Sequence, residues 1–135
     1  RDLVERTRRE GKAREVHIRI GSPPVIAPCF YGIDMSTLGE LFAPNFLKKG
    51  YSPEDLEETS HKMAKILGAD SLRYLPVGDI APSIGLAHEH LCTACVTANY
   101  PSEAGERIYC SEKARRKDGR QGRSYDSECA DDSEE

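Results

Sequence analysis

Two of the chain's five cysteines form a CxxC pair, Cys92 and Cys95, and the other three stand at positions 29, 110 and 129. Thiolates bind iron–sulfur clusters and metal ions, and the CxxC spacing places two sulfurs on one local turn. An odd cysteine count argues against a disulfide framework, and the mostly charged residues 1–15 predict no signal peptide. We therefore expect a cytoplasmic, reducing environment, in which such a pair indicates metal or redox chemistry.

Two histidines beside this pair leave a second kind of site open. His88, His90, Cys92 and Cys95 offer two imidazoles and two thiolates within a short stretch, enough donors for tetrahedral zinc. The spacing is not a familiar zinc pattern, and ligands so close in sequence would crowd one another. Buried cysteines with histidines at the surface are the remaining interpretation.

The composition sets limits on the classes of function. A length of 135 residues allows one domain at most, and 38% hydrophobic against 31% charged residues predicts a modest core. A formal net charge of -4 gives no electrostatic reason to expect a nucleic-acid partner. No apolar run approaches the roughly 20 residues that a membrane-spanning helix needs, so no membrane association is expected.

The opening residues predict a helix followed by a strand. Residues 2–10 have helical character, and Gly11 suits the left-handed position that ends many helices. In residues 15–20, Val16, Ile18 and Ile20 alternate with polar residues, as in a half-buried strand, and His17 and Arg19 are expected in solvent. A helix, a glycine and a strand in this order indicate an α/β fold.

Further along, residues 25–35 predict an irregular, mostly apolar connection. Thr37 and Glu40 fit the capping box of a short helix to residue 42. Ser52 followed by Pro53 and acidic residues predicts a helix over 53–67, which ends at Gly68. Its buried face is expected to contain the apolar residues Leu56, Met63, Ile66 and Leu67.

Residues 71–75 predict a short strand, and residues 77–86 a small helix with Ile80 and Ile84 facing inward. From residue 111 onward no apolar periodicity remains: six basic residues lie between 112 and 123, and six acids between 124 and 135. We interpret 1–110 as the ordered part and 111–135 as a disordered, charged tail.

Three stretches together resemble the amidophosphoribosyltransferase family. They are GKAREVHIRIGSPPV (11–25), PCFYGIDMST (28–37) with Glu40 and Leu41 after it, and LGADSLRYL (67–75) followed by LCTACVTANYP (91–101). Their order and spacing resemble the C-terminal third of that family, over roughly residues 2–101. The PCFYGID and CTACxTxxYP elements are specific, whereas the helix and strand alone would be weak.

The resemblance implies that the parent protein makes 5-phosphoribosylamine from phosphoribosylpyrophosphate and glutamine, the first step of purine synthesis, with Mg²⁺ at the phosphoribosylpyrophosphate. It implies a fold that is the end of a type I phosphoribosyltransferase domain with a helical C-terminal extension. The partners would be the glutaminase and the rest of the transferase, in a homo-oligomer. The chain opens at Arg1 in a helix already under way, and the family's substrate-binding loop lies upstream. We therefore expect no catalytic residue in this chain and no activity of the chain alone.

The resemblance also implies site residues. Cys29, Cys92 and Cys95 resemble three of the four ligands of the [4Fe–4S] cluster in one subgroup, the fourth lying upstream. Tyr31, Asp34 and Leu41 resemble residues at the interface with the glutaminase and the ammonia passage. A purely local interpretation is that Ile33 and Leu41 are core residues and that Asp34 caps a helix. The rival class of function is a stand-alone Fe–S or zinc-binding module, or a regulatory subunit.

Overall fold

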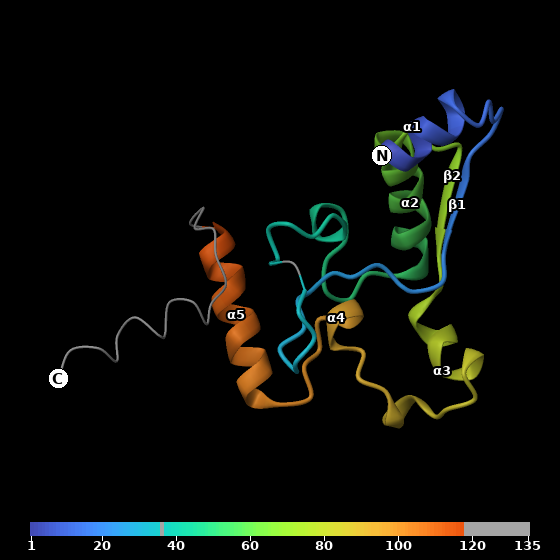
Figure 1. The fold of residues 1–135 in the computed structure, drawn as a ribbon. Coiled ribbons are helices and arrows are strands. Elements are labelled where there is room, and N and C mark those ends of the chain that lie inside the picture. Colours follow the sequence, from blue (N-terminus) through green and yellow to red (C-terminus); the bar gives the residue numbers. More distant parts are fainter. Residues whose placement is uncertain (36, 118–135) are drawn as a thin grey trace. The chain divides into compact units, whose positions relative to one another are not determined.

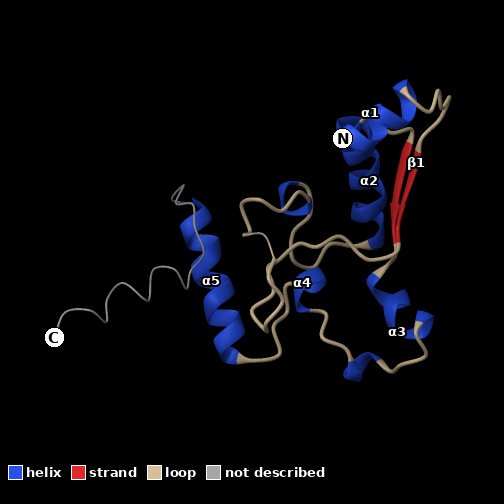
Figure 2. Cartoon of the chain, viewed as in Figure 1, coloured by secondary structure: helices blue, strands red, loops and turns tan. Residues whose placement is uncertain are grey.

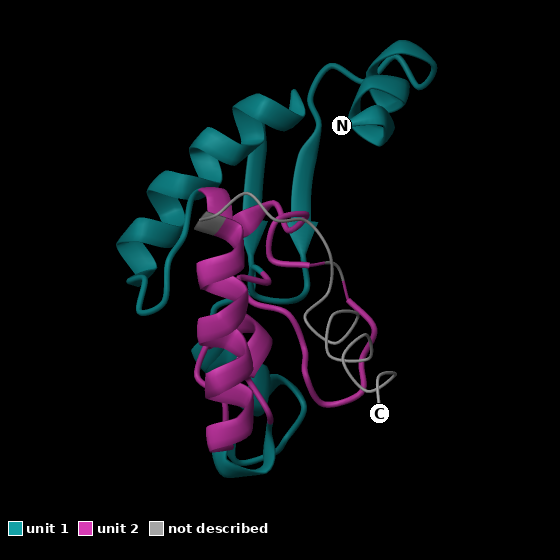
Figure 3. Cartoon of the chain, turned by 90° about the vertical axis from the view of Figure 1, so that its left-hand side faces the viewer, with its two compact units in different colours: residues 1–24, 46–91 teal, residues 25–45, 92–135 magenta. Residues whose placement is uncertain are grey.

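The computed structural model describes residues 1–35 and 37–117. The chain divides into two compact units, each assembled from two stretches of sequence (Figure 3). Unit 1 comprises residues 1–24 and 46–91, and unit 2 comprises residues 25–45 and 92–135. From the chain length we expected one domain at most. Composition could not reveal the two units, because neither is a continuous stretch bounded by a linker.

Unit 1 has α/β architecture, as expected from the sequence. Strands β1 (His17–Ile20) and β2 (Ser71–Tyr74) form a two-stranded parallel sheet, in which His17 is opposite Ser71 and Ile20 is opposite Tyr74 (Figure 2). Helix α1 (Asp2–Arg9) precedes β1, and helix α2 (Pro53–Leu67) leads into β2 (Figure 1). The predicted alternation in β1 is confirmed: Ile18 and Ile20 are half-buried, whereas His17 and Arg19 are exposed.

Helix α2 begins and ends at the predicted residues. The Ser52 hydroxyl accepts the Asp55 N–H at 3.1 Å, and the Asp55 carboxylate accepts the Ser52 N–H at 2.9 Å. This reciprocal pair is a capping box that satisfies two backbone donors at the helix start. At the other end Gly68 adopts φ 77°, the left-handed conformation that a glycine reaches without strain.

The buried face of α2 differs from the predicted one at one residue. Leu56, Met63 and Ala64 are buried, together with Thr59 and Ser60. Ile66, which we placed on this face, is 53% exposed. At 100° per residue, the buried positions lie between about −60° and +80° of position 56, and position 66, at about −80°, falls just outside this arc. Leu67 lies within the arc but is only half-buried. Met63 packs toward the sheet, where its sulfur accepts the Tyr74 hydroxyl at 3.7 Å.

The turn after α1 uses its glycine in a different way from the one predicted. Lys12, with φ 51°, takes the left-handed conformation, and Gly11 does not. A Cβ at Gly11 would lie 2.7 Å from the Thr7 carbonyl oxygen. The position therefore excludes a side chain because the helix backbone passes too close, and not because of its own φ angle.

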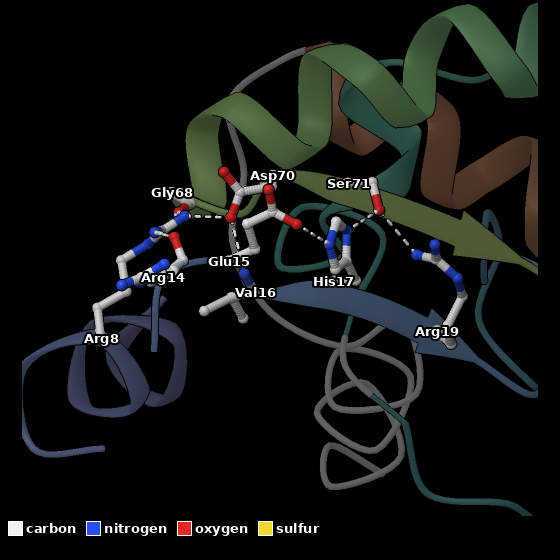
Figure 4. A network of polar contacts seen from close by, with 9 residues as sticks. All are labelled: Arg8, Arg14, Glu15, Val16, His17, Arg19, Gly68, Asp70 and Ser71. Carbon is white, nitrogen blue, oxygen red and sulfur yellow. Dashed lines mark hydrogen bonds and ion pairs between the residues drawn. The ribbon is translucent and has the colours of Figure 1, made fainter. Parts of the chain in front are cut away.

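Arg8 and Asp70 connect the elements of unit 1 at the start of the sheet (Figure 4). The Arg8 guanidinium donates to the carbonyls of Gly68 (3.1 and 3.2 Å) and Arg14 (3.2 Å) and pairs with the Asp70 carboxylate. The same carboxylate accepts the Val16 N–H at 2.7 Å, and the Asp70 N–H donates back to the Val16 carbonyl at 2.9 Å. The Val16 hydrogen bond, followed by Arg8, holds the pKa of Asp70 below its ordinary value.

The exposed face of the sheet carries a second polar chain. His17 Nδ1 lies 2.8 Å from the Ser71 hydroxyl, and His17 Nε2 lies 3.0 Å from a Glu15 carboxylate oxygen (Figure 4). Arg19 donates to the same Ser71 hydroxyl at 2.9 Å. The expectation of solvent exposure for His17 and Arg19 is confirmed, but both side chains are also ordered by hydrogen bonds.

The last part of unit 1 contains short helical turns: η2 (Val77–Asp79), α3 (Ile80–Ser83) and η3 (His88–His90). The predicted helix over 77–86 is thus divided between two turns and ends at Ser83. Ala81 is fully buried, whereas Ile84, expected to face inward, is 57% exposed. The helix stops before Ile84 could return to the buried side.

Unit 2 contains η1 (Ala43–Asn45), α4 (Ala94–Thr97) and α5 (Glu103–Lys117). Residues 25–35 form no helix or strand, as predicted. The helix predicted to end at residue 42 is a turn: Glu40 accepts the Thr37 N–H and hydroxyl, both at 2.9 Å, but no helical repeat follows. The tail predicted from residue 111 is wrong for 111–117, which belong to α5, and residues 118–135 lie outside the described part of the chain.

None of the helices in the described ranges is long and apolar enough to span a membrane.

Candidate metal centre

Unit 2 brings together the three cysteines that the sequence singled out. Cys29 lies in the irregular segment 25–35, Cys92 just before α4, and Cys95 within α4. The backbone N–H groups of Ile26 and Ala27 donate to the Cys95 carbonyl at 2.9 and 3.0 Å. Ile26 and Ala27 are fully buried, so this junction is part of the core of unit 2. The distant cysteine is thereby attached to the CxxC turn by the backbone alone.

The sulfur atoms have distinct surroundings. The Tyr31 N–H donates to the Cys29 sulfur at 3.4 Å. Burial raises the pKa of the Cys95 thiol, and the charges of Cys29 and Cys92 raise it further. Cys29 and Cys92 thus both act electrostatically on Cys95. Cys29 and Cys95 are partly buried, whereas Cys92 and Cys110 are exposed.

A single metal ion has no preformed site here. Within residues 1–35 and 37–117, no three His, Cys, Asp or Glu side chains are placed to hold one metal ion. His88 and His90 are both exposed on η3, and the zinc interpretation stays a prediction. A [4Fe–4S] cluster makes a different demand, because each thiolate binds a separate corner iron and the ligand sulfurs are spread more widely.

The residues expected at a domain interface lie on the surface of the same unit. Tyr31 is 43% exposed, and its hydroxyl lies 3.0 Å from that of Ser102. Asp34 is exposed and Leu41 is half-buried. Ile33, which the local interpretation placed in a core, is 65% exposed. The local interpretation is therefore wrong at Ile33, whereas the capping role of Asp34 stays a prediction, because residue 36, near which its helix was expected to start, lies outside the described part of the chain.

An aromatic cluster beside the cysteines was not recognised in the sequence. Tyr100 is 7% exposed, and its ring centroid lies 5.1 Å from that of Phe30, 6.2 Å from Tyr31 and 5.3 Å from Tyr109. The Tyr100 hydroxyl donates to the Pro28 carbonyl at 2.6 Å. Burial, and then the charges of neighbours that include Cys95 and Cys29, raise the pKa of Tyr100.

Helix α5 was also missed, although a signal for its start was present. The Ser102 hydroxyl accepts the Gly105 N–H at 3.2 Å, and the Ser102 carbonyl accepts the Glu106 N–H at 3.1 Å, as at a serine N-cap. A serine with glutamates one and four residues later predicts a helix start. The buried positions that follow are Gly105, Tyr109 and Glu112, which have helical spacing but are not an apolar stripe.

Comparison with known proteins gives one consistent result. No family model matches the chain. Curated proteins named amidophosphoribosyltransferase do match: the one from Methanocaldococcus jannaschii is 42% identical over 103 residues, and the one from Bacillus subtilis 39% over 99 residues. A Drosophila melanogaster relative is 39% identical over 103 residues. These matches cover 76%, 70% and 69% of this chain, but 19%, 18% and 17% of the relatives. The chain thus spans about a fifth of their length.

Proposed function

We propose that this chain, which is homologous to a segment of the amidophosphoribosyltransferases, supplies the cluster-binding and domain-interface part of such an enzyme. The single observation that supports this most is the agreement between the similarity and the geometry. The similarity extends over 76% of the chain, and the chain's backbone hydrogen bonds join the Cys29 loop to the CxxC turn. The parent reaction would be the formation of 5-phosphoribosylamine in purine biosynthesis, in the cytoplasm.

In this proposal Cys29, Cys92 and Cys95 hold three corners of a [4Fe–4S] cluster, and the fourth ligand comes from another part of the parent protein. The donor set suits such a cluster: three thiols, one of which already accepts an N–H at 3.4 Å. The cluster would act as a structural link between chain segments, because transfer of a phosphoribosyl group moves no electrons.

The parallel strands β1 and β2 would be the end of a type I phosphoribosyltransferase sheet. Two parallel strands rarely stand alone, because parallel sheets are normally covered on both faces. Tyr31, Asp34 and Leu41 would lie toward the glutaminase and the ammonia passage. The residues that bind phosphoribosylpyrophosphate and Mg²⁺ would lie elsewhere in the parent enzyme, which we expect to be a homo-oligomer, and the isolated chain would be inactive.

A chimera tests the enzymatic part of this proposal. The matching segment of the Bacillus subtilis relative is replaced by this chain, and glutamine-dependent formation of phosphoribosylamine is measured. The control is the chimera with the relative's own segment put back. We expect activity in the chimera and none in the isolated chain. A folded chimera without activity, beside an active control, would show that this chain cannot serve as that part of the enzyme.

Anaerobic reconstitution tests the cluster separately. The chain is incubated with ferrous iron and sulfide, desalted, and analysed for both elements. We expect Cys29→Ala, Cys92→Ala and Cys95→Ala each to lower the bound iron and sulfide, whereas Cys110→Ala, the matched control, leaves them unchanged. Equal binding by all four variants would refute the assignment of the ligands, and binding of zinc alone would favour a stand-alone metal module.

A further inference from the structure

Tyr100 occupies a central position between the cysteines and helix α5. Its hydroxyl donates to the carbonyl of Pro28, the residue before Cys29, at 2.6 Å. Its ring contacts Phe30, the residue after Cys29, with centroids 5.1 Å apart. One side chain therefore restrains the backbone on both sides of Cys29.

Helix α5 is fastened to the same loop near both of its ends. Near its start the Tyr31 hydroxyl lies 3.0 Å from the Ser102 hydroxyl, and the Glu106 carboxylate accepts the Tyr100 N–H at 3.0 Å. Near its far end Arg116 donates to the Asn45 side-chain oxygen at 2.7 Å. The polar contacts with segment 25–45, at Ser102 and Arg116, are thus separated by about four turns of helix.

Gly105 allows this close approach. A Cβ at this position would overlap the Tyr31 hydroxyl and would lie 3.0 Å from Tyr100 Cβ and 3.2 Å from Tyr100 Cδ1. One turn later, the Tyr109 ring packs on Tyr100 at 5.3 Å. The face of α5 that contains Gly105 and Tyr109 therefore presses on Tyr100.

The accessibility of the cysteines agrees with this arrangement. Cys29 and Cys95 are partly buried, whereas Cys92 and Cys110 are exposed. A thiol reacts with an electrophile or a peroxide only when its sulfur can be reached, so burial separates these four residues into two classes.

We propose that Tyr100 is a positioning residue for the cysteine site, and that with helix α5 it forms a cover that limits access of solvent-borne reagents to Cys29 and Cys95. In this proposal the hydroxyl fixes the Cys29 loop through Pro28, and the ring, which packs against Phe30 and against Tyr109 of α5, holds the helix beside that loop. This inference deepens the proposed function by assigning protection of its thiols to named residues, and it rests on these cysteines being the ligands. The cover is a property of the chain without iron, so its test does not depend on cluster formation.

The test is the alkylation rate of each cysteine in the full chain, without iron and under anaerobic conditions. Iodoacetamide forms a thioether with a thiolate and releases iodide, and peptide mass spectrometry gives a separate rate for each residue. Cys92 and Cys110 serve as exposed references in the same molecule. We expect Cys29 and Cys95 to react more slowly than both references.

Two substitutions of Tyr100 separate its hydroxyl from its ring. Tyr100→Phe removes only the bond to Pro28, so we expect faster alkylation of Cys29 with Cys95 unchanged. Tyr100→Leu also removes the ring contacts, so both rates rise, by about fivefold, because local opening becomes easier. The reference rates stay constant in both variants. A merely structural role would not produce this difference between the two cysteines.

Gly105→Ala is an independent variant for the case in which Tyr100→Leu fails to fold, as judged by circular dichroism. It keeps every aromatic side chain but adds a methyl group that would overlap the Tyr31 hydroxyl and lie 3.0 Å from Tyr100 Cβ, so the packing of α5 on these rings must shift, and we expect Cys29 and Cys95 to react faster. Gly39→Ala is the matched control in the same unit, since a Cβ there meets nothing within 4 Å. The proposal is overturned if Cys29 and Cys95 react as fast as Cys110 in the unaltered chain. It is also overturned if neither Tyr100→Leu nor Gly105→Ala changes their rates. If Cys29 and Cys95 are alkylated slowly but the chain binds no iron, the proposed cover is supported and the proposed cluster is refuted.

Discussion

Replacing Gly105 by alanine sets two effects of known size against each other. Within a helix, alanine is favoured over glycine by about 1 kcal/mol. At this position, however, the new methyl group would overlap the Tyr31 hydroxyl. Tyr31 is 43% exposed and can rotate away, but it then loses its hydrogen bond to Ser102. A hydrogen bond of this kind contributes about 1 kcal/mol. The contacts with Tyr100 at 3.0 and 3.2 Å must also yield.

The free energy of unfolding should therefore hardly change, or fall slightly, in Gly105→Ala, instead of rising as helix propensity alone requires. In a Tyr31→Phe background the hydroxyl is absent and its hydrogen bond is already lost. Gly105→Ala should then stabilise the chain relative to Tyr31→Phe. The coupling energy between the two positions is expected to be about 1 kcal/mol.

The assay is urea denaturation of the four proteins of this double-mutant cycle, followed by circular dichroism at a helix-sensitive wavelength. Gly39→Ala provides the control for the general effect of removing a glycine from the unfolded chain. Changes that are additive within about 0.3 kcal/mol would refute the close approach of α5 to Tyr31. A clear stabilisation by Gly105→Ala alone would refute it as well.

Three further outcomes are expected in unit 1. Asp70→Asn should lower the melting temperature, because the carboxylate that joins Val16 to Arg8 is lost. The pKa of Asp70 is depressed in the folded chain, so its contribution to stability is present above its ordinary pKa of 3.8 and is lost as the pH falls below it. Melting curves from neutral to acid pH should therefore converge for Asp70→Asn and the unaltered chain; a constant difference would contradict this. Ser52→Ala should cost about 1 kcal/mol in urea denaturation by removing the cap of α2, whereas Ser111→Ala, exposed on α5, should cost little; equal effects would exclude the cap as the cause.

Local signals in the sequence predicted the elements that depend on local chemistry. Helix α2 combines Ser52, Pro53 and a reciprocal Asp55 with a terminal Gly68, and each of these acts within one helical turn. The strands were predicted because alternation of apolar and polar residues requires only one buried face. The prediction that Cys29 shares a site with the CxxC turn rested on the family resemblance, because no local sequence pattern relates residues so far apart.

The remaining features depend on contacts that local patterns do not express. Helix α5 buries Gly105, Tyr109 and Glu112, and a glycine and a glutamate do not produce an apolar stripe. Gly11 is required because of the Thr7 carbonyl, which sequence alone does not place beside it. The role of Tyr100 depends on a hydrogen bond to a carbonyl 72 residues earlier. The division into two units was likewise not predictable from composition.

The interleaving of the two units has a consequence for the order in which the chain can fold. Paired residues of β1 and β2 lie 54 positions apart in sequence, and the Cys29 loop meets Tyr100 only when the second stretch of unit 2 begins, 72 positions after Pro28. During synthesis, residues 1–24 of unit 1 emerge before the rest of their unit, residues 46–91. Residues 25–45 of unit 2 emerge between them, before the second stretch of unit 2 has been made. Pairings of such large sequence separation are slow, because the entropy of loop closure is lost before any contact compensates for it. Helix α2, with its local caps, is therefore the element on which the rest can assemble.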